Sequence, residues 1–195
     1  MRQRKVLVVL FALCCLALFA APSQSQEGGT ERITGTVVFM SGRSSGQTRP
    51  FTLTVNQFSA PNQLRELNDA LSNGGQDKLV DKLNDMNAGR IQIGTGVGVR
   101  ANAVVVDPWG DGGRRIIVLY ERDIRFFELR YGTRSSDYRI GYAEIYLDRN
   151  GKGEGTLIPA ARVRLKGGNT WEVEDFGVFP ARLMALRSRG RVTPR

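Results

Sequence analysis

The 195-residue sequence contains no histidine, and its only two cysteines, Cys14 and Cys15, lie near the N-terminus. Hydrolysis by a Ser-His-Asp or Cys-His arrangement is therefore excluded, because both arrangements need an imidazole base. The usual zinc and c-type haem sites are excluded as well, since Cys and His supply their ligands. Chemistry that depends on carboxylates, on Ser, Lys or Tyr nucleophiles, or on oxygen-liganded metals remains open.

The N-terminus has the pattern of a secretory signal peptide, which we place at residues 1–25. Basic residues precede an uninterrupted apolar segment at residues 6–21, and small residues follow it. This segment is shorter than the ~20 residues that a membrane-spanning helix needs. A lipoprotein signal at Cys14 is disfavoured, because Leu13 stands where a small residue is required. We therefore expect an exported protein, periplasmic or secreted, without a transmembrane anchor after cleavage.

Removal of the signal peptide leaves a chain without cysteine, which can form no disulfide and must be stabilised by its core. The 28 Lys and Arg fall to 25 without Arg2, Arg4 and Lys5, against 19 Asp and Glu, so the net charge becomes +6. Because basic and acidic residues are mostly interspersed, this charge is typical of a solvated surface. Contact with an anionic envelope component is the alternative interpretation.

We predict a single β-rich domain over residues 33–187, because a chain of this length can bury a core of its own. A flexible lead-in at residues 26–32 precedes it, and a basic disordered tail at residues 188–195 follows it. Residues 33–40 are rich in β-branched side chains, and residues 51–58 alternate apolar and polar side chains. Both patterns are typical of strands, and we expect these two to form a hairpin.

A helical hairpin is predicted at about residues 60–88, inserted between strands. Ser59 is a candidate N-cap, and Pro61 fits the first helical turn, where a missing N–H costs little. Gly74-Gly75 separates the two expected helices. We expect their apolar stripe to face the core, with a dimerisation groove as the alternative. The stripe consists of Leu64, Leu67, Leu71, Leu79, Val80, Leu83 and Met86.

The glycine run at residues 94–98 resembles a nucleotide-binding loop only in composition. Val99 breaks the Rossmann spacing, no Lys-Ser/Thr pair follows, and residues 100–107 have the pattern of a strand rather than a helix. We interpret the run as a bend between strands.

Residues 148–155 match a calcium-binding loop in part. Lys152 occupies a ligand position, however, and Pro159 stands where the bidentate Glu is needed. Asn150-Gly151 between two strand patterns predicts a hairpin turn instead, so we expect no metal here.

Residues 116–121 form a near-continuous apolar run, which predicts a central strand covered on both faces. Residues 156–165 and 170–175 are predicted to pair through a three-residue loop, because this register sets like residues opposite like. The expected pairs are Leu165–Trp171, Arg164–Glu172, Val163–Val173 and Arg162–Glu174. Further strands are expected at residues 90–94, 125–131 and 138–147, and residues 176–186 are expected to form a last strand or an edge segment after Pro180.

Together these elements predict an α+β fold, mainly an antiparallel β sandwich or partly closed barrel with the helical hairpin inserted. Glu121, Asp123 and Glu128 lie among apolar strand residues, but each has an arginine close in sequence. We therefore expect salt bridges rather than catalysis. A carboxylate-based glycan hydrolase, which needs two such acids in one cleft, with Glu144 as a further candidate, is kept as an alternative.

We expect a non-enzymatic, exported binding module that needs no cofactor. Its ligand is either a small apolar molecule or glycan, or an anionic envelope component. The aromatic candidates for ligand contact are Trp109, Tyr131, Tyr138 and Tyr142. Trp109, in the turn at residues 107–113, could stack on a sugar or lie at a membrane interface, but we favour a lid on the core.

The candidates for contact with an anionic surface are the arginines near the C-terminus: Arg187, Arg189, Arg191 and Arg195. A structural or interaction protein of the envelope that works through a sheet edge is the alternative function. Arginines interleaved with aromatic residues are also typical of nucleic-acid surfaces. Nucleic acid is nevertheless not expected as a partner, because export separates the protein from it.

Overall fold

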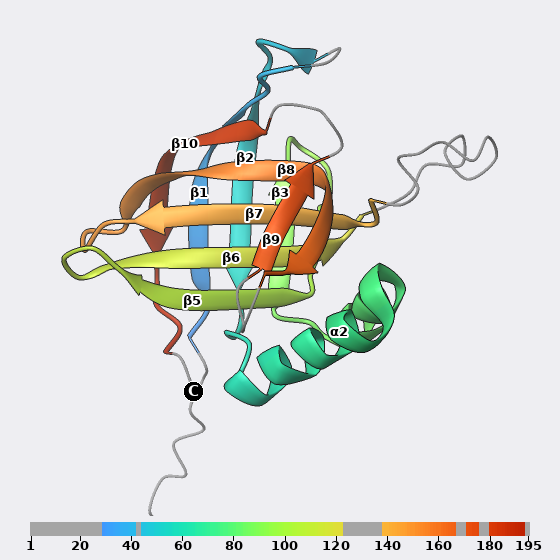
Figure 1. Ribbon diagram of the computed structural model, residues 1–195. Helices are drawn as coiled ribbons and strands as arrows, with labels where there is room; N and C mark the ends of the chain where they lie inside the picture. The colour runs from blue at the N-terminus through green and yellow to red at the C-terminus, as the bar shows by residue number, and fades with distance from the viewer. Residues whose placement is uncertain (1–28, 42–43, 123–137, 167–170, 176–179, 194–195) are drawn as a thin grey trace, which may run out of the picture.

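The computed structural model describes residues 29–41, 44–122, 138–166, 171–175 and 180–193 (Figure 1). The predicted signal peptide, the strand expected at residues 125–131, Tyr131 and Arg195 lie outside the described residues. Within these residues the structure has one ten-stranded sheet and one helix, α2 (Pro61–Asn84). None of the helical structure described is long and apolar enough to cross a membrane.

All strand pairings are antiparallel, as the sequence predicts. The hydrogen-bonded order is β4-β3-β2-β1-β10-β8-β7-β6-β5, and β9 pairs with β8 outside this path. The strands are β1 (Glu31–Val38), β2 (Thr48–Val55), β3 (Gly89–Ile93), β4 (Val99–Ala101), β5 (Ala103–Trp109), β6 (Gly113–Glu121), β7 (Ile140–Leu147), β8 (Lys152–Leu165), β9 (Trp171–Asp175) and β10 (Ala181–Arg189).

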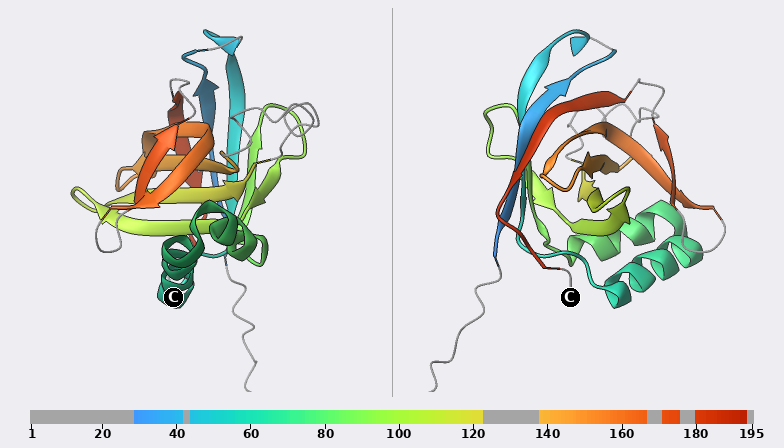
Figure 2. Two further views of the ribbon diagram at one scale, coloured as in Figure 1. Left: turned by 45° about the vertical axis from the view of Figure 1, so that its right-hand side comes forward. Right: turned by 90° about the vertical axis from the view of Figure 1, so that its left-hand side faces the viewer.

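The sheet folds over itself into two layers, and α2 adds a third. Strands β1, β2 and β3 cross behind β5 to β8 in Figure 1, and α2 lies against the other face of β5 to β8 (Figures 1 and 2). Strand β10 connects the layers, because it pairs with both β1 and β8 and carries a register shift toward each. Ala185, with a φ of 53°, lies at this irregularity.

Two apolar clusters fill the spaces between these layers, and β6 contributes to both. Ile116 and Val118 pack in the cluster between the two halves of the sheet. Ile117 and Leu119 pack in the cluster under α2. The prediction that residues 116–121 form a strand covered on both faces is therefore confirmed.

The sheet does not close into a barrel, since β4 and β5 stand at the two ends of the hydrogen-bonded path. They are nevertheless consecutive in the chain, separated only by the buried Asn102. Its amide Nδ2 donates to the carbonyl of Leu83 at 2.8 Å, and its Oδ1 accepts from the backbone N–H of Glu121 at 2.9 Å. Asn102 thus fixes the corner where the chain passes from β4 to β5.

The predicted hairpin of two helices is not confirmed, because the structure has the single helix α2 in this region. Gly75, with φ 63° and ψ −148°, interrupts it, and Lys82 reaches Glu66 at 2.6 Å across the bend. The expected cap is wrong: the hydroxyl of Ser59 accepts the N–H of Val104 in β5 instead. The apolar stripe does face the core, with all of its members buried except Leu64, which is half-buried.

Both expected boundaries of the domain are too narrow. Strand β1 begins at Glu31, inside the predicted lead-in, and β10 extends to Arg189, inside the predicted tail. Glu31 and Val192 are both buried. The reason is a buried ion pair at this end of the sheet: Arg114 donates to the Glu31 carboxylate at 2.9 and 2.6 Å, and Ser188 donates to the same carboxylate.

The register predicted for the β8–β9 hairpin is confirmed for all four pairs. The salt bridges of this hairpin join residues that are diagonal to each other rather than directly opposite. Arg164 binds Glu174 at 2.9 Å, and Lys166 binds Glu172 at 3.5 Å. The glycine run is confirmed as a turn between β3 and β4. The turn at residues 148–151 is confirmed as well, with the Asp148 carboxylate accepting two backbone N–H groups at 2.8 Å.

Candidate ligand-binding site

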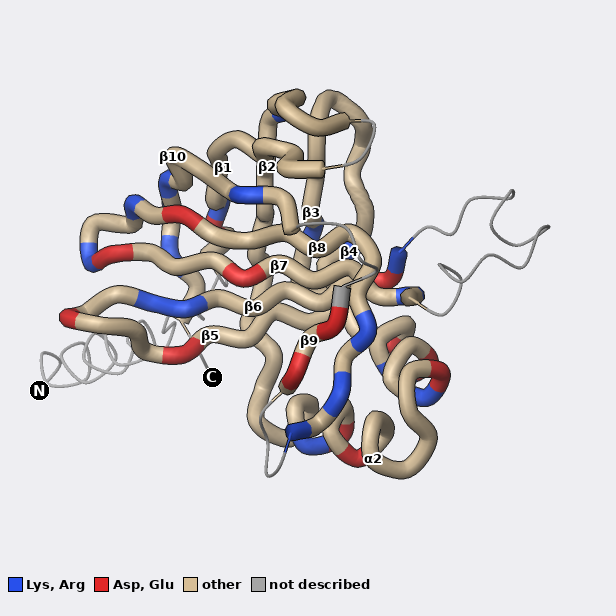
Figure 3. The backbone as a smooth tube through the Cα atoms, turned by 45° about the horizontal axis from the view of Figure 1, so that its top comes forward, with Lys and Arg blue, Asp and Glu red and all other residues tan. Residues whose placement is uncertain are grey.

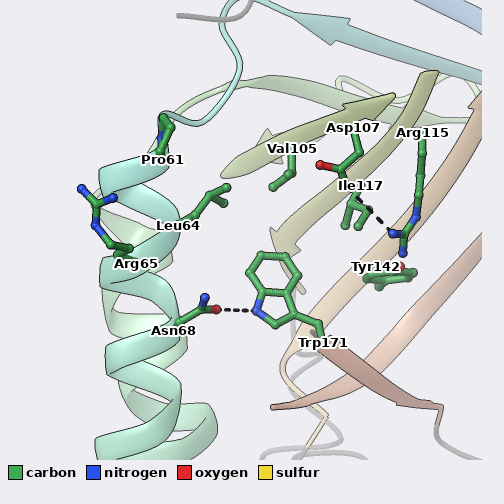
Figure 4. A pocket seen from close by; sticks show the side chains of 10 residues that line it. All are labelled: Pro61, Leu64, Arg65, Asn68, Val105, Asp107, Arg115, Ile117, Tyr142 and Trp171. Carbon is green, nitrogen blue, oxygen red and sulfur yellow. Dashed lines mark hydrogen bonds and ion pairs between the residues drawn. The ribbon is translucent and has the colours of Figure 1, made fainter. Parts of the chain in front are cut away.

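A cavity of about 480 Å³ lies between α2 and the outer face of the sheet (Figure 4). This volume falls within the ~300–1,000 Å³ that is typical of small-molecule sites. Its lining residues come from α2, β5, β6, β7 and β9: Pro61, Leu64, Arg65, Asn68, Val105, Asp107, Arg115, Ile117, Tyr142 and Trp171.

Most of the cavity wall is apolar because of how the strands alternate. Val105 of β5 stands opposite Ile117 of β6, so both side chains point out of the sheet toward α2. Leu64 projects toward them from the helix, and the ring of Trp171 lies between helix and sheet (Figure 4). The cavity therefore offers an apolar slot between two rigid elements.

Trp171 is held in place from two directions. Its backbone pairs with Leu165 in the β8–β9 hairpin. Its indole Nε1 donates to the side-chain oxygen of Asn68 on α2 at 2.6 Å. The half-buried indole thereby joins β9 to the helix and forms one wall of the cavity.

The opposite end of the cavity is polar. The Arg115 guanidinium donates to the Glu144 carboxylate at 2.5 Å and lies 3.9 Å from the Asp107 carboxylate. The hydroxyl of Tyr146 donates to the same oxygen of Glu144 at 2.8 Å. Glu144 is thus engaged on one oxygen by two partners, which leaves it poorly placed to act as a base.

The two tyrosines of this region remain protonated at neutral pH. Burial raises the pKa of Tyr142, and the nearby negative charge of Glu144 raises it further. Burial also raises the pKa of Tyr146, together with its hydrogen bond to Glu144. Both phenols therefore act as neutral groups at neutral pH.

Arg65 supplies a second positive charge at the rim of the cavity. It is exposed on α2, and among the described residues it forms no salt bridge. Asp107, which is also exposed, is the carboxylate in the lining, and it already lies near Arg115. The lining thus carries two arginines and one carboxylate, a balance that favours an anionic group over a cationic one.

Of the four aromatic residues predicted to contact a ligand, Tyr142 alone among the described ones lines this cavity. Tyr138 is buried, and its hydroxyl donates to Glu174 at 2.9 Å. Trp109 is 52% exposed and tilts against Tyr146, with 4.6 Å between ring centroids. The predicted lid on the core is therefore wrong for Trp109.

The predicted basic residues lie elsewhere. Arg187 and Arg189 are exposed on β10, and Arg191 is exposed just after it. Sequence reasoning did not assign Asn68, Arg115 or Trp171 to a site. Asn68 and Trp171 are far apart in sequence, so no local pattern could have joined them.

The acids considered for catalysis do not converge within the described residues. Glu144 is bound to Arg115, and Glu121 stands at the end of β6 with its backbone held by Asn102. Asp123 and Glu128 lie outside the described residues. The part of the chain that the structure describes has no group of three His, Cys, Asp or Glu that could hold a metal ion.

Comparisons with known proteins assign no family to this chain. It matches no family model, no curated protein and no solved structure.

Proposed function

We propose that the chain is an exported, non-catalytic binding protein whose cavity under α2 takes a small amphipathic ligand. The ligand has an aromatic or aliphatic body and one anionic group. The observation that carries this proposal is a cavity of about 480 Å³ with an apolar slot, with Arg115 at its polar end and Arg65 on the helix side of its rim.

The apolar body lies between Leu64, Ile117 and Trp171, where it replaces water against three apolar surfaces. Burial of such surface contributes roughly 25 cal/mol per Å². The anionic group lies near Arg115, which donates a charge-assisted hydrogen bond to it, and the charge of Arg65 on the helix side of the rim adds to the attraction. The Asn68–Trp171 hydrogen bond keeps the wall in place before the ligand arrives, which lowers the entropy cost of binding.

Export is supported by the basic and apolar pattern of residues 1–25. A non-catalytic role is supported by the residue types present, since the chain has no histidine and its cysteines lie only in the predicted signal peptide. The engagement of Glu144 by Arg115 and Tyr146 further counts against the glycan hydrolase alternative.

The sheet-edge alternative has less support. The edge strand β5 carries Pro108, which has no N–H to offer, next to the charged Asp107. The short strand β9 carries the acids Glu172 and Glu174. Proline and charged residues at sheet edges are devices against edge pairing.

The test uses Trp171 as a reporter. The chain has two tryptophans, so Trp109→Phe leaves Trp171 as the sole one. We expect a saturable change in its fluorescence on titration with 1-anilinonaphthalene-8-sulfonate, which has an aromatic body and one anionic group. Arg65→Gln in this background should weaken binding several-fold, whereas Arg162→Gln, an exposed arginine on β8, should not. A Trp171 signal that never saturates, or equal effects of the two substitutions, would sink the proposal.

A further inference from the structure

The layer of the sheet that faces away from α2 has an unusual charge composition. Strands β1, β2, β3, β4 and β10 contain one acid, Glu31, which is completely buried and bound to Arg114. All exposed charges on these five strands are arginines, and Figure 3 shows blue segments along β1 and β10. They are Arg32, Arg49, Arg90, Arg100, Arg182, Arg187 and Arg189.

Strand pairing aligns four of these arginines in one row. Arg189 of β10 stands opposite Arg32 of β1, which stands opposite Thr54 of β2. Thr54 stands opposite Arg90 of β3, which stands opposite Arg100 of β4. Residues directly opposite each other in antiparallel strands point to the same face. Arg189, Arg32, Thr54, Arg90 and Arg100 therefore form a row, the arginine row, that spans about 19 Å at the ~4.8 Å spacing of strands.

The adjacent row on the same face extends the positive charge. Arg187 of β10 stands opposite Thr34 of β1, and the row continues through Thr52 to Gln92 of β3. Lys152 of β8 stands on the other side of Arg187. The face thus offers guanidinium groups flanked by hydroxyl and amide donors.

Nothing acidic in the described residues neutralises the arginine row. Arg90 donates to the carbonyls of Val97 and Gly98, and Arg100 donates to the carbonyl of Asn84. The side chains of Arg32 and Arg189 form no hydrogen bond or salt bridge within the described part of the chain. Like charges that face each other across strands destabilise a sheet. A row of this kind therefore costs folding free energy that a bound anion would recover.

We propose that the arginine row binds a linear polyanion that lies across the strands, such as a polysaccharide with repeated sulfate, phosphate or carboxylate groups. The row is one-dimensional and regularly spaced, which matches a polymer with repeated charges. Guanidinium groups bind such oxyanions in a two-pronged manner, and Thr54 adds a hydroxyl donor.

A lipid surface fits this face less well. Proteins that lie on membranes combine basic residues with large apolar side chains that enter the interface. Within the two rows the positions between the arginines are occupied by Thr34, Thr52, Thr54 and Gln92, and exposed large apolar side chains lie beside the rows, at Met184 of β10 and at Val97 in the β3–β4 turn. Occupation of the cavity leaves the row free, because the row lies on the other side of the sheet layers from the cavity (Figure 2). Its end member Arg100 reaches the carbonyl of Asn84 at the C-terminal end of α2.

The experiment measures binding of the full mature chain to heparin at several NaCl concentrations. The row variant is Arg32→Gln/Arg90→Gln/Arg189→Gln. The control variant is Arg149→Gln/Arg162→Gln/Lys166→Gln, which removes the same charge from exposed basic residues off the row. Circular dichroism establishes that both variants remain folded.

We expect the row variant to bind heparin at least about tenfold more weakly than the control variant. The slope of log K against log[NaCl] should also fall by about 2 to 3, given ~0.9 per neutralised charge on duplex DNA. A heparin disaccharide, too short to span the row, should bind far more weakly than long chains.

Three outcomes would overturn the proposal. The first is that the wild-type protein does not bind heparin. The second is that both triple variants lose affinity equally, which would mean that net charge alone determines heparin binding. The third is binding to phosphatidylglycerol vesicles but not to heparin, which would indicate a membrane surface. The Trp171 fluorescence titration is independent of all three, so failure here is distinct from failure of the cavity proposal.

Discussion

The arginines of this protein fall into two groups that differ in what faces them. On β6 and β8, Arg115 binds Glu144 and Arg164 binds Glu174, so the charges are neutralised within the fold. In the arginine row of β1 to β4 and β10, arginines face arginines or threonine. Arginines of the first group stabilise the sheet, whereas repulsion among those of the second group opposes its formation. The following experiments test this difference between the two groups.

The largest effect is expected at Glu31, the one acid of the arginine-rich layer. Glu31→Gln should lower the free energy of unfolding by about 3 to 5 kcal/mol, because it leaves the Arg114 guanidinium without its buried partner. Urea unfolding at pH 7 measures this. Glu154→Gln, at an exposed acid on β8, is the control and should stay within about 0.5 kcal/mol of wild type. Equal stability of the two variants would contradict the contribution assigned to the Glu31–Arg114 pair.

The same pair predicts a pH dependence. Burial alone would raise the pKa of Glu31, but the hydrogen bonds from Arg114 and Ser188 and the charge of Arg114 outweigh it, so the pKa lies below its ordinary value. The unfolded chain therefore binds a proton at higher pH than the folded one. The stabilisation is present above the ordinary carboxyl pKa of 4.5 and is lost as the pH falls through the folded value. Wild type and Glu31→Gln should accordingly converge in stability in acid.

The next effect is expected at Asn102, where the chain passes from one layer to the other. Asn102→Ala should cost about 2 to 3 kcal/mol, because the Leu83 carbonyl and the Glu121 N–H both lose a largely buried partner. Thermal unfolding measures the change. Asn87→Ala, at an exposed position, is the matched control. If the two alanine variants unfold at the same temperature, Asn102 does not fix the corner between the layers.

A smaller effect on stability is expected where an arginine already forms a salt bridge with an acidic residue. Glu174→Gln removes the charge that binds Arg164, while the amide oxygen can still accept from Tyr138. Because the Glu174 side chain is 43% exposed, solvent screens the pair and the loss should be about 0.5 to 1 kcal/mol. Lys166→Gln, which loses a longer and more exposed pair with Glu172, should change stability less. The order of the two losses in urea unfolding tests whether neutralised charges stabilise this sheet.

The contrast also explains what could be predicted from sequence. The β8–β9 register followed from a short loop and from like residues facing like, so Leu165 opposite Trp171 was accessible without the fold. The strand at residues 116–121 was accessible for a similar reason, since its apolar run needs cover on both faces. Both signals are contained in a few consecutive residues.

Long-range features were not accessible in this way. The hydrogen bond between Trp171 and Asn68 and the ion pair between Glu31 and Arg114 join segments far apart in the chain. Glu31 therefore looked like part of a flexible lead-in. Arg189 looked like part of a disordered tail, because its pairing with Arg32 joins the two ends of the domain. The row of arginines across these strands can be recognised only when those pairings are known.

The smallest stability effect is the sharpest test of the contrast. Thr54 is the one uncharged position in the arginine row, between Arg32 and Arg90. Thr54→Glu gives both arginines an acid directly opposite, as in the β8–β9 hairpin. We expect the free energy of unfolding to rise by about 0.5 kcal/mol, since each such cross-strand pair contributes ~0.2–1 kcal/mol and glutamate fits a strand less well than threonine.

The matched control is Thr52→Glu, which adds the same charge to the same face of β2, one row away. Thr52 stands between Thr34 and Gln92, so the new acid has no arginine directly opposite. Thr52→Glu should not stabilise the protein, and the gain in Thr54→Glu should shrink in high salt. Heparin affinity should fall more for Thr54→Glu, because the acid neutralises the row at its centre. A gain in stability without a loss of heparin affinity would mean that these arginines repel one another but bind nothing.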